Sequence, residues 1–253
     1  MKFCKYSIML FSIVLLITGC SYRALYTADD ISPDVTITET RNKIEIRPNQ
    51  PTVTDTGLLF YPGGLVDNHV YNEILSDFVG EAGIAALITK MPGNLAVFDI
   101  DAGLSVIEDY PEITTWIIAG HSLGGAMAAA VVYDNPDVFE GLILMDSRPA
   151  SGNSLADWDG RVLSLYSSIE KIEDVDSTLS LLPPETWLDE TETDYPAETS
   201  NYTVVHQIDG GSHSYFGTYG PQDGDYEPTI TREAFHAEVI EYMIEFFNEN
   251  GWR

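Results

Sequence analysis

A serine flanked by glycines stands in the segment W-I-I-A-G-H-S-L-G-G-A-M-A-A-A, from Trp116 to Ala130. The pattern G-x-S-x-G (Gly120, Ser122 and Gly124) follows an apolar run and precedes a run of small residues, which predicts a strand, a sharp turn and a helix. In so tight a turn, side chains at Gly120 and Gly124 would collide with neighbouring backbone, and Ser122 is expected in strained φ/ψ. The turn lifts the Ser122 hydroxyl clear of the sheet. Ser122 is therefore a candidate nucleophile for acyl transfer.

A nucleophilic serine needs a base, and histidine is the usual one. Three of the five histidines follow this turn. His213 lies in G-G-S-H, a flexible turn that follows the last apolar strand Y-T-V-V-H-Q-I, at the strand end where active sites of such sheets form. His206 is inside that strand and is expected between the layers. His236 lies at helical spacing with apolar neighbours and is expected to pack. The sequence therefore favours His213 as the base.

A carboxylate must orient the histidine and stabilise its charged form, and either Asp or Glu can do this. Glu170 comes just after the apolar run R-V-L-S-L-Y-S, the strand before the last. Asp146 ends the preceding strand in L-I-L-M-D-S and is the alternative. Position favours Glu170, and the nearby acids that compete with it are Glu173, Asp174 and Asp176.

Acyl transfer also needs two backbone N–H groups aimed at the oxyanion, one of which follows the nucleophile. This makes the N–H of Leu123 the first expected donor. The segment P-G-G-L, from Pro62 to Leu65, follows the strand L-L-F-Y and predicts the second. Backbone without side chains can approach a substrate closely. Gly64, with Leu65 as its neighbour, is therefore the second expected donor.

The elements that must position these residues are short apolar runs alternating with helical stretches from Gly57 onward. This alternation predicts an α/β fold, with a mostly parallel sheet and helices on both faces. The expected strands are Leu58–Tyr61, Ala85–Lys90, Thr115–Ala119, Gly141–Met145, Arg161–Ser167 and Tyr202–Ile208. The expected helices are Tyr71–Ala82, Asp101–Tyr110, Leu123–Tyr133, Ile172–Leu181 and Arg232–Asn248. The longer loops, Pro183–Asn201 and Ser214–Thr231, are too short or too polar to form a large lid domain.

The first nineteen residues are typical of an export signal, with Lys2 and Lys5 followed by an apolar run of eleven residues, Ile8 to Thr18. The run ends in I-T-G-C, which resembles the lipobox of bacterial lipoproteins. That resemblance implies cleavage before Cys20 and acylation of its thiol. We therefore expect an exported protein anchored to a bacterial membrane. The alternating stretches V-T-I-T-E-T and K-I-E-I-R predict a tether with one or two edge strands over residues 20–50, before a main domain of residues 51–253.

The amino-acid composition limits which kinds of molecule this protein can bind. The chain has 40 Asp plus Glu against 12 Lys plus Arg, and removal of the signal takes the formal charge from −28 to −30. Such a surface repels phosphate backbones, which excludes nucleic acid as a partner. The two cysteines are Cys4, in the signal, and Cys20. The mature chain therefore offers no intramolecular disulfide and no cysteine-based metal site, and no cofactor is expected.

Four further stretches carry a resemblance to a known family. They are Y-P-G-G-L-V-D, K-M-P-G-N-L-A-V-F-D, G-H-S-L-G-G-A-M-A and G-G-S-H-S-Y-F-G-T-Y-G-P-Q, spread from about Tyr61 to Gln222. Together they resemble a compact bacterial branch of the α/β-hydrolases, akin to the dienelactone-hydrolase-like proteins. The resemblance implies an eight-stranded sheet and a Ser–acid–His triad without a cofactor, and it implies that the loops Ala96–Asp101 and Phe216–Pro221 border the site. Relatives tend to have Y-G-S-x-D where this chain has Y-S-S-I-E, which aligns Glu170 with the acid.

These patterns lead us to expect a serine hydrolase of the carboxylesterase type, which cleaves small carboxylic esters through an acyl-enzyme. Two alternatives stay open. The same triad could serve an amidase or peptidase, or the chain could be a membrane-anchored binding protein that keeps the fold without activity.

Overall fold

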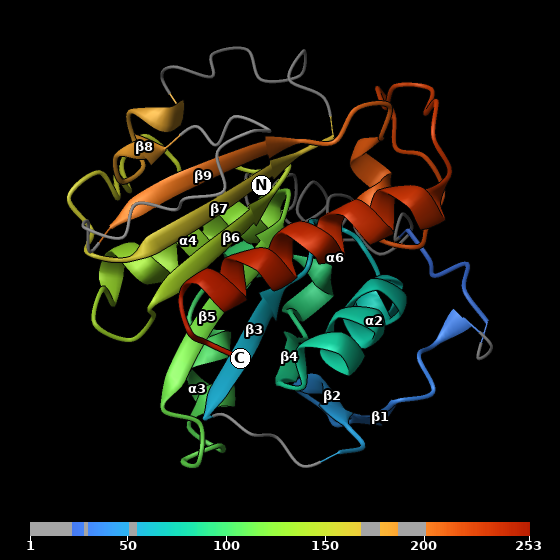
Figure 1. Ribbon diagram of the computed structural model, residues 1–253, viewed down its shortest axis with the longest axis horizontal. Helices are drawn as coiled ribbons and strands as arrows, with labels where there is room; N and C mark the ends of the chain where they lie inside the picture. Colours follow the sequence, from blue (N-terminus) through green and yellow to red (C-terminus); the bar gives the residue numbers. More distant parts are fainter. Residues whose placement is uncertain (1–21, 28–29, 51–54, 168–177, 187–200) are drawn as a thin grey trace, which may run out of the picture.

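A single mixed sheet organises the protein. The computed structural model describes residues 22–27, 30–50, 55–167, 178–186 and 201–253 (Figure 1). The strands are β1 (Val35–Glu39), β2 (Lys43–Pro48), β3 (Thr56–Tyr61), β4 (Ala85–Thr89), β5 (Thr115–His121), β6 (Gly141–Met145), β7 (Arg161–Tyr166), β8 (Glu185–Thr186) and β9 (Tyr202–Gln207). They are ordered β1-β2-β4-β3-β5-β6-β7-β9-β8. The pairs β1–β2 and β2–β4 are antiparallel, and all the other pairs are parallel.

Helices cover both faces of this sheet. The α-helices are α2 (Asn72–Ala82), α3 (Ala102–Ile107), α4 (Leu123–Asp134) and α6 (Arg232–Glu249). Short 3₁₀ helices are η2 (Asn68–Tyr71), η3 (Pro92–Asn94), η4 (Ala96–Phe98) and η6 (His213–Phe216). Figure 1 shows α2 and α6 in front of the sheet, with α3 and α4 behind it. The α/β fold expected from the sequence, a mostly parallel sheet with helices on both faces, is confirmed.

The core follows the two-residue repeat of the strands, because successive side chains point to opposite faces. In β3, Leu58 and Phe60 join a cluster with side chains of α2 and α6. Leu59 and Tyr61 join a second cluster with side chains of α3 and α4. All four side chains are fully buried. The central strands are therefore apolar on both faces, as parallel strands between two helical layers must be.

The expected strands and helices in the described residues are present, with ends within three residues of those predicted. The predicted helix Ile172–Leu181 lies mostly outside the described residues. Within the described chain the sheet has nine strands rather than eight. The additional strand is β8, a two-residue strand parallel to β9. It falls in the predicted acidic loop Pro183–Asn201, where two residues are too few to produce an alternating pattern.

The two predicted N-terminal strands belong to the main sheet. β1 forms its edge, and β2 lies inside it, paired with β4. In the described part of the chain, no helix combines the length and apolarity needed to cross a bilayer.

Parallel pairing aligns the carboxyl ends of the central strands. Gly120 in β5 pairs with Tyr61 in β3, and His121 pairs with Met145 in β6. Farther along the sheet, Tyr166 in β7 pairs with Gln207 in β9. The segments that follow these strands therefore meet at one edge, where sites form in this kind of sheet.

Candidate active site

The turn between β5 and α4 has the strained backbone that the sequence predicts. The backbone of Ser122 has φ 54° and ψ −125°, a conformation that residues other than glycine rarely adopt. A Cβ at Gly120 would lie 2.6 Å from the carbonyl carbon of Gly124, and one at Gly124 would lie 2.1 Å from the carbonyl oxygen of Tyr61. The expected collision with backbone is confirmed, because only glycine fits at either position.

Contacts with the end of β6 and the segment just after it hold Ser122 in this strained turn. The Ser122 N–H donates to the carbonyl oxygen of Met145 at 2.9 Å. The Ser147 hydroxyl donates to the carbonyl oxygen of Ser122 at 2.5 Å. Such strain costs about 1–3 kcal/mol and persists only where the surroundings enforce it. Ser122 also precedes the first turn of α4, where the free N–H groups and the helix dipole favour developing negative charge. Ser147 was not predicted, since nothing in its local sequence marks it.

His213 lies in η6, after β9, and contacts a carboxylate. Its Nδ1 is 3.0 Å from Oδ2 of Asp146, which directly follows β6. The side chains of His213 and Asp146 are 16% and 8% exposed. The His213 ring packs on the ring of His121, the residue before the serine, with 4.5 Å between ring centroids. His213, Asp146 and the serine turn therefore lie at the same edge of the sheet.

Asp146 is held as an acceptor. Its backbone has φ 43°, and its N–H donates to the carbonyl oxygen of Leu165 at 2.8 Å. The Ser167 N–H donates to Oδ1 at 2.8 Å, and the Ser167 hydroxyl donates to Oδ2. Together with His213, these donors suit an ionised carboxylate, because each carboxylate oxygen only accepts. Asp146 was the alternative acid in the sequence. Glu170, which the sequence favours, lies outside the described residues, as do Glu173, Asp174 and Asp176.

The loop after β3 carries the expected second oxyanion donor. Almost every backbone N–H group in this loop donates a hydrogen bond. The donors and acceptors are Gly63 N–H to the Tyr71 hydroxyl at 2.8 Å, Leu65 N–H to Asn94 O at 2.7 Å, Val66 N–H to Gly63 O at 3.3 Å and Asp67 N–H to Tyr22 O at 2.8 Å. Among the described residues, the Gly64 N–H has no such partner, and neither has the N–H of Leu123. A Cβ on Gly64 would lie 2.9 Å from Cδ2 of Leu123, so this loop and the serine turn are in close contact.

A buried pair, Tyr71 and His121, links this loop to the serine turn. The Tyr71 hydroxyl accepts from Gly63 N–H and lies 3.0 Å from Nδ1 of His121. Burial raises the pKa of Tyr71 well above its usual value and lowers the pKa of His121 well below its usual value, with a smaller contribution from His213 to the latter. Both side chains are therefore neutral at pH 7, and the hydroxyl donates to Nδ1, an assignment that follows from the hydrogen bonds. Sequence reasoning did not find this link.

The other downstream histidines have different surroundings. His206 is half-buried in β9 and stacks on Tyr242, with 3.9 Å between ring centroids. Burial lowers the pKa of His206 to about 4. His236 is buried in α6, as expected, but it also makes polar contacts. Its Nε2 lies 2.8 Å from the carbonyl oxygen of Tyr215, and its Nδ1 is 3.6 Å from Oε1 of Glu73.

Of the two loops that the family resemblance places at the site, Phe216–Pro221 contacts the residue before Ser122. For the other loop, the contact is made by the residue before it, because a Cβ on Gly64 would lie 3.5 Å from Cδ2 of Leu95, which precedes Ala96–Asp101. Phe216, at the start of the Phe216–Pro221 loop, packs on His121 with 5.5 Å between ring centroids. Across the described residues, no group of three His, Cys, Asp or Glu side chains is arranged to hold a metal ion.

Comparison with solved structures shows the same fold in hydrolases of low sequence identity. Dienelactone hydrolase from Anabaena variabilis is 14% identical, with a TM-score of 0.56 over 85% of this chain and 97% of its own. Carboxyl esterase 2 from the mycorrhizal fungus Tuber melanosporum is 10% identical, with a TM-score of 0.58 over 92% and 90%. The predicted CIB-like hydrolase from Thermoplasma acidophilum is 14% identical, with a TM-score of 0.51 over 83% and 97%.

A search of curated proteins finds no match to this sequence. Residues 57–237, by contrast, match the alpha/beta hydrolase family, and this stretch spans well over half of the chain. It includes the serine turn, Asp146 and His213. The chain belongs to the alpha/beta hydrolase family.

Proposed function

We propose that the protein is a serine hydrolase that cleaves small carboxylic esters through an acyl-enzyme on Ser122. The observation that carries the proposal is the contact between His213 Nδ1 and Asp146 Oδ2 at the edge where strained Ser122 stands. The imidazole is thereby oriented, and its other nitrogen is left for a nucleophile. The resemblance in fold to an esterase and a dienelactone hydrolase is consistent with ester cleavage.

The reaction has two steps. His213 Nε2 removes the Ser122 proton as Oγ attacks the carbonyl carbon of the ester, and Asp146 stabilises the imidazolium that forms. The N–H groups of Leu123 and Gly64 donate to the oxyanion. The tetrahedral intermediate then loses its alkoxy group, which takes the proton from His213 and leaves as the alcohol. Water, with His213 again as base, cleaves the acyl-enzyme, releasing the carboxylic acid and the Ser122 hydroxyl.

Asp146 is the acid in this proposal, in place of the favoured Glu170. Three donors, from Ser167 and His213, converge on its carboxylate. Such second contacts hold a carboxylate in the geometry that a triad needs. Glu170 stays in the test as the competing carboxylate.

We also propose that Cys20 is acylated and anchors the exported protein to a bacterial membrane. Support comes from the I-T-G-C sequence that follows an apolar run of eleven residues. Mass spectrometry of the protein recovered from membranes tests this. The expected mature chain begins at Cys20 and carries the mass of acyl groups, and Cys20→Ser abolishes both. An uncleaved N-terminus on membrane-bound protein would contradict the proposal.

The catalytic proposal is tested with p-nitrophenyl acetate, butyrate and octanoate. Wild type is expected to hydrolyse them, and Ser122→Ala to lose roughly a thousandfold or more in kcat. Asp146→Asn should lose far more activity than Glu170→Gln, and the reverse order would return the acid to Glu170. Faster cleavage of anilides or peptides than of esters would favour an amidase. An inert wild type whose Ser122 does not react with a fluorophosphonate would favour a binding protein.

A further inference from the structure

Residues Tyr22–Tyr26, hereafter the N-terminal strap, contact the two loops that flank the candidate site. The sequence predicts a tether here, yet Tyr22 forms a parallel bridge with Val66 in the loop after β3. The Tyr22 N–H donates to the carbonyl oxygen of Leu65 at 2.9 Å, and the Tyr22 carbonyl oxygen accepts from Asp67 N–H at 2.8 Å. The strap is therefore a short added strand on the loop that carries Gly64.

The strap also reaches the loop that follows His213. The Leu25 N–H donates to the carbonyl oxygen of Thr218 at 2.9 Å. The ring of Tyr22 packs on that of Tyr219, with 5.6 Å between centroids. At the end of the strap, the Tyr26 hydroxyl accepts from the Asn72 side chain at 2.7 Å. One five-residue segment thus joins the loop on the oxyanion side to the loop on the histidine side.

The backbone of Leu65 explains why the Gly64 loop needs such support. Leu65 has φ 58°, a left-handed conformation that costs a branched side chain about 1–3 kcal/mol and relaxes unless its neighbours enforce it. Two hydrogen bonds fix the residue, from its N–H to the carbonyl oxygen of Asn94 and from the Tyr22 N–H to its carbonyl oxygen. Relaxation of Leu65 would turn the peptide group that joins it to Gly64 and so shift Gly64 itself, whose own N–H lies in the preceding peptide group.

We propose that the N-terminal strap positions the oxyanion donor, with the hydrogen bond from Tyr22 N–H to Leu65 O keeping the Gly64 N–H aimed at the oxyanion. This inference rests on the proposed function, because it assigns the strap a part in that reaction. In this proposal the strap acts through Leu65, so it is a positioning segment. Because the oxyanion forms only during the reaction, a misdirected donor lowers kcat and leaves the binding of substrate nearly unchanged.

The strap lies at the surface, so its loss should spare the fold. Leu25 is 63% exposed, and Tyr22 is only partly buried. The strap adds one isolated bridge beside the large sheet and fills none of the fully buried core positions. A variant that breaks one strap hydrogen bond can therefore be compared with wild type as a folded protein.

The test compares Tyr22→Pro with Tyr22→Ala in the full-length chain. Both lose the ring, but only proline lacks the N–H that donates to Leu65. Relative to Tyr22→Ala, we expect Tyr22→Pro to lower kcat for p-nitrophenyl butyrate roughly 10- to 100-fold, with KM within about twofold. Inhibition by a trifluoromethyl ketone, whose adduct carries the oxyanion, should weaken by the same factor. Inhibition by the matching alcohol, which forms no adduct, should not change.

A second pair of variants keeps the proposal testable if Tyr22→Pro fails to fold. Leu25→Pro removes the N–H that donates to Thr218, and Leu25→Ala keeps it. We expect Leu25→Pro to lower kcat about three- to tenfold relative to Leu25→Ala, with the melting temperatures of the two within about 3 °C. Equal kcat within both pairs, in an active wild type, overturns the strap proposal and leaves the esterase proposal standing. A wild type that neither hydrolyses esters nor reacts with a fluorophosphonate at Ser122 overturns both.

Discussion

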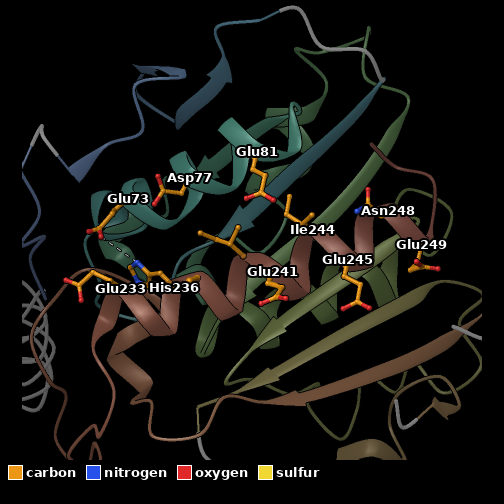
Figure 2. Close-up of a pocket in the computed structure, with 12 residues that line it drawn as sticks. Glu73, Asp77, Glu81, Glu233, His236, Glu241, Ile244, Glu245, Asn248 and Glu249 are labelled. Carbon is orange, nitrogen blue, oxygen red and sulfur yellow. Dashed lines mark ion pairs between the residues drawn. The ribbon is translucent and has the colours of Figure 1, made fainter. Parts of the chain in front are cut away.

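Two regions of this protein each contain a histidine that faces a carboxylate, partly buried in the first region and buried in the second. At the carboxyl edge of the sheet, His213 Nδ1 lies 3.0 Å from Asp146. Between α2 and α6, His236 Nδ1 lies 3.6 Å from Glu73, at one end of a groove lined mainly by acidic side chains (Figure 2). Both regions pair a histidine Nδ1 with a carboxylate, but the two histidines differ in what surrounds Nε2.

His236 has both nitrogens engaged, because its Nε2 also lies 2.8 Å from the carbonyl oxygen of Tyr215. Glu73 in turn accepts from the Thr218 hydroxyl at 2.6 Å. Tyr215 and Thr218 follow His213 closely, so this second pair fastens the segment that carries the first. For His213, no hydrogen bond to Nε2 is found among the described residues. A histidine–carboxylate pair therefore becomes a candidate for catalysis only when a nitrogen is left for a nucleophile.

The groove around the second pair is strongly anionic. It has a volume of about 760 Å³, and Figure 2 shows acidic side chains of both helices along it. Burial, with the charge of Glu73, raises the pKa of Asp77. Burial, with the charges of Glu249 and Glu241, raises the pKa of Glu245. Around the first pair, by contrast, hydrogen-bond donors surround the carboxylate, as Ser167 does for Asp146.

The largest expected difference between the pairs is in activity. Asp146→Asn should lower kcat for p-nitrophenyl butyrate roughly 10³- to 10⁴-fold, because the amide cannot stabilise the imidazolium and favours the wrong tautomer. Glu73→Gln should change kcat less than about fivefold, while lowering the free energy of unfolding by about 1 kcal/mol. Steady-state kinetics and urea unfolding measure both. Equal losses of kcat would remove the distinction drawn here.

The hydroxyl groups that donate to Asp146 and Glu73 allow a second test, in which the expected change in kcat is smaller. Ser167→Ala removes the hydroxyl that donates to Asp146, and we expect kcat to fall about tenfold, the usual cost of losing an outer partner of a functional side chain. Thr218→Val removes the hydroxyl that donates to Glu73 and should leave kcat within about twofold. The same kinetic assay applies. A larger effect at Thr218 than at Ser167 would assign the groove a part in the reaction.

A histidine without a carboxylate provides a reference for both pairs. The pKa of His206 is lowered to about 4, so between its unfolded pKa of about 6.5 and pH 4 the unfolded chain binds the extra proton. The free energy of unfolding should therefore fall as the pH drops through this range. Since His206 is partly exposed, solvent screening limits the effect to about 2 kcal/mol. Urea unfolding of His206→Gln should show a smaller loss, and an identical pH profile would refute the assignment.

The smallest effect is expected at the acids of the groove. Because the folded pKa values of Asp77 and Glu245 are raised, native stability falls as the pH rises from the ordinary pKa of each carboxyl to its raised value, and the loss is complete above it. Asp77→Asn and Glu245→Gln should each raise the melting temperature at pH 7 by about 1–3 °C, and added salt should reduce the gain. The exposed Glu227 provides a control, Glu227→Gln, with no expected change. A lower melting temperature for both groove variants would contradict this.

The serine turn could be predicted from sequence because its causes are local. The strain at Ser122 and the need for Gly120 and Gly124 arise within five residues. The same holds for the strands, whose apolar runs are continuous, and for His213, which follows β9 after a short glycine-containing turn. The position of the Gly64 loop beside the serine turn could be predicted in the same way, because Gly64 follows a strand closely.

The partners of these residues were not predictable in the same way. Asp146 meets His213 across 67 positions of the chain, and position in the sequence favoured Glu170 as the acid. Tyr71 and His121 contact each other across 50 positions. The strap was missed for another reason. Its contacts with Leu65 use only backbone atoms of Tyr22, which every residue but proline possesses.

The strap also determines how far the site can stand from an anchor on Cys20. Tyr22 is two positions after Cys20, and an extended chain advances about 3.3–3.6 Å per residue. With Cys20 acylated as proposed above, a chain of at most about 7 Å joins the lipid to the residue that donates to Leu65. The oxyanion side of the site is then held close to the bilayer surface. The anchored protein would encounter esters dissolved in that bilayer by lateral diffusion in two dimensions. The effective concentration of these esters would be well above their concentration in water.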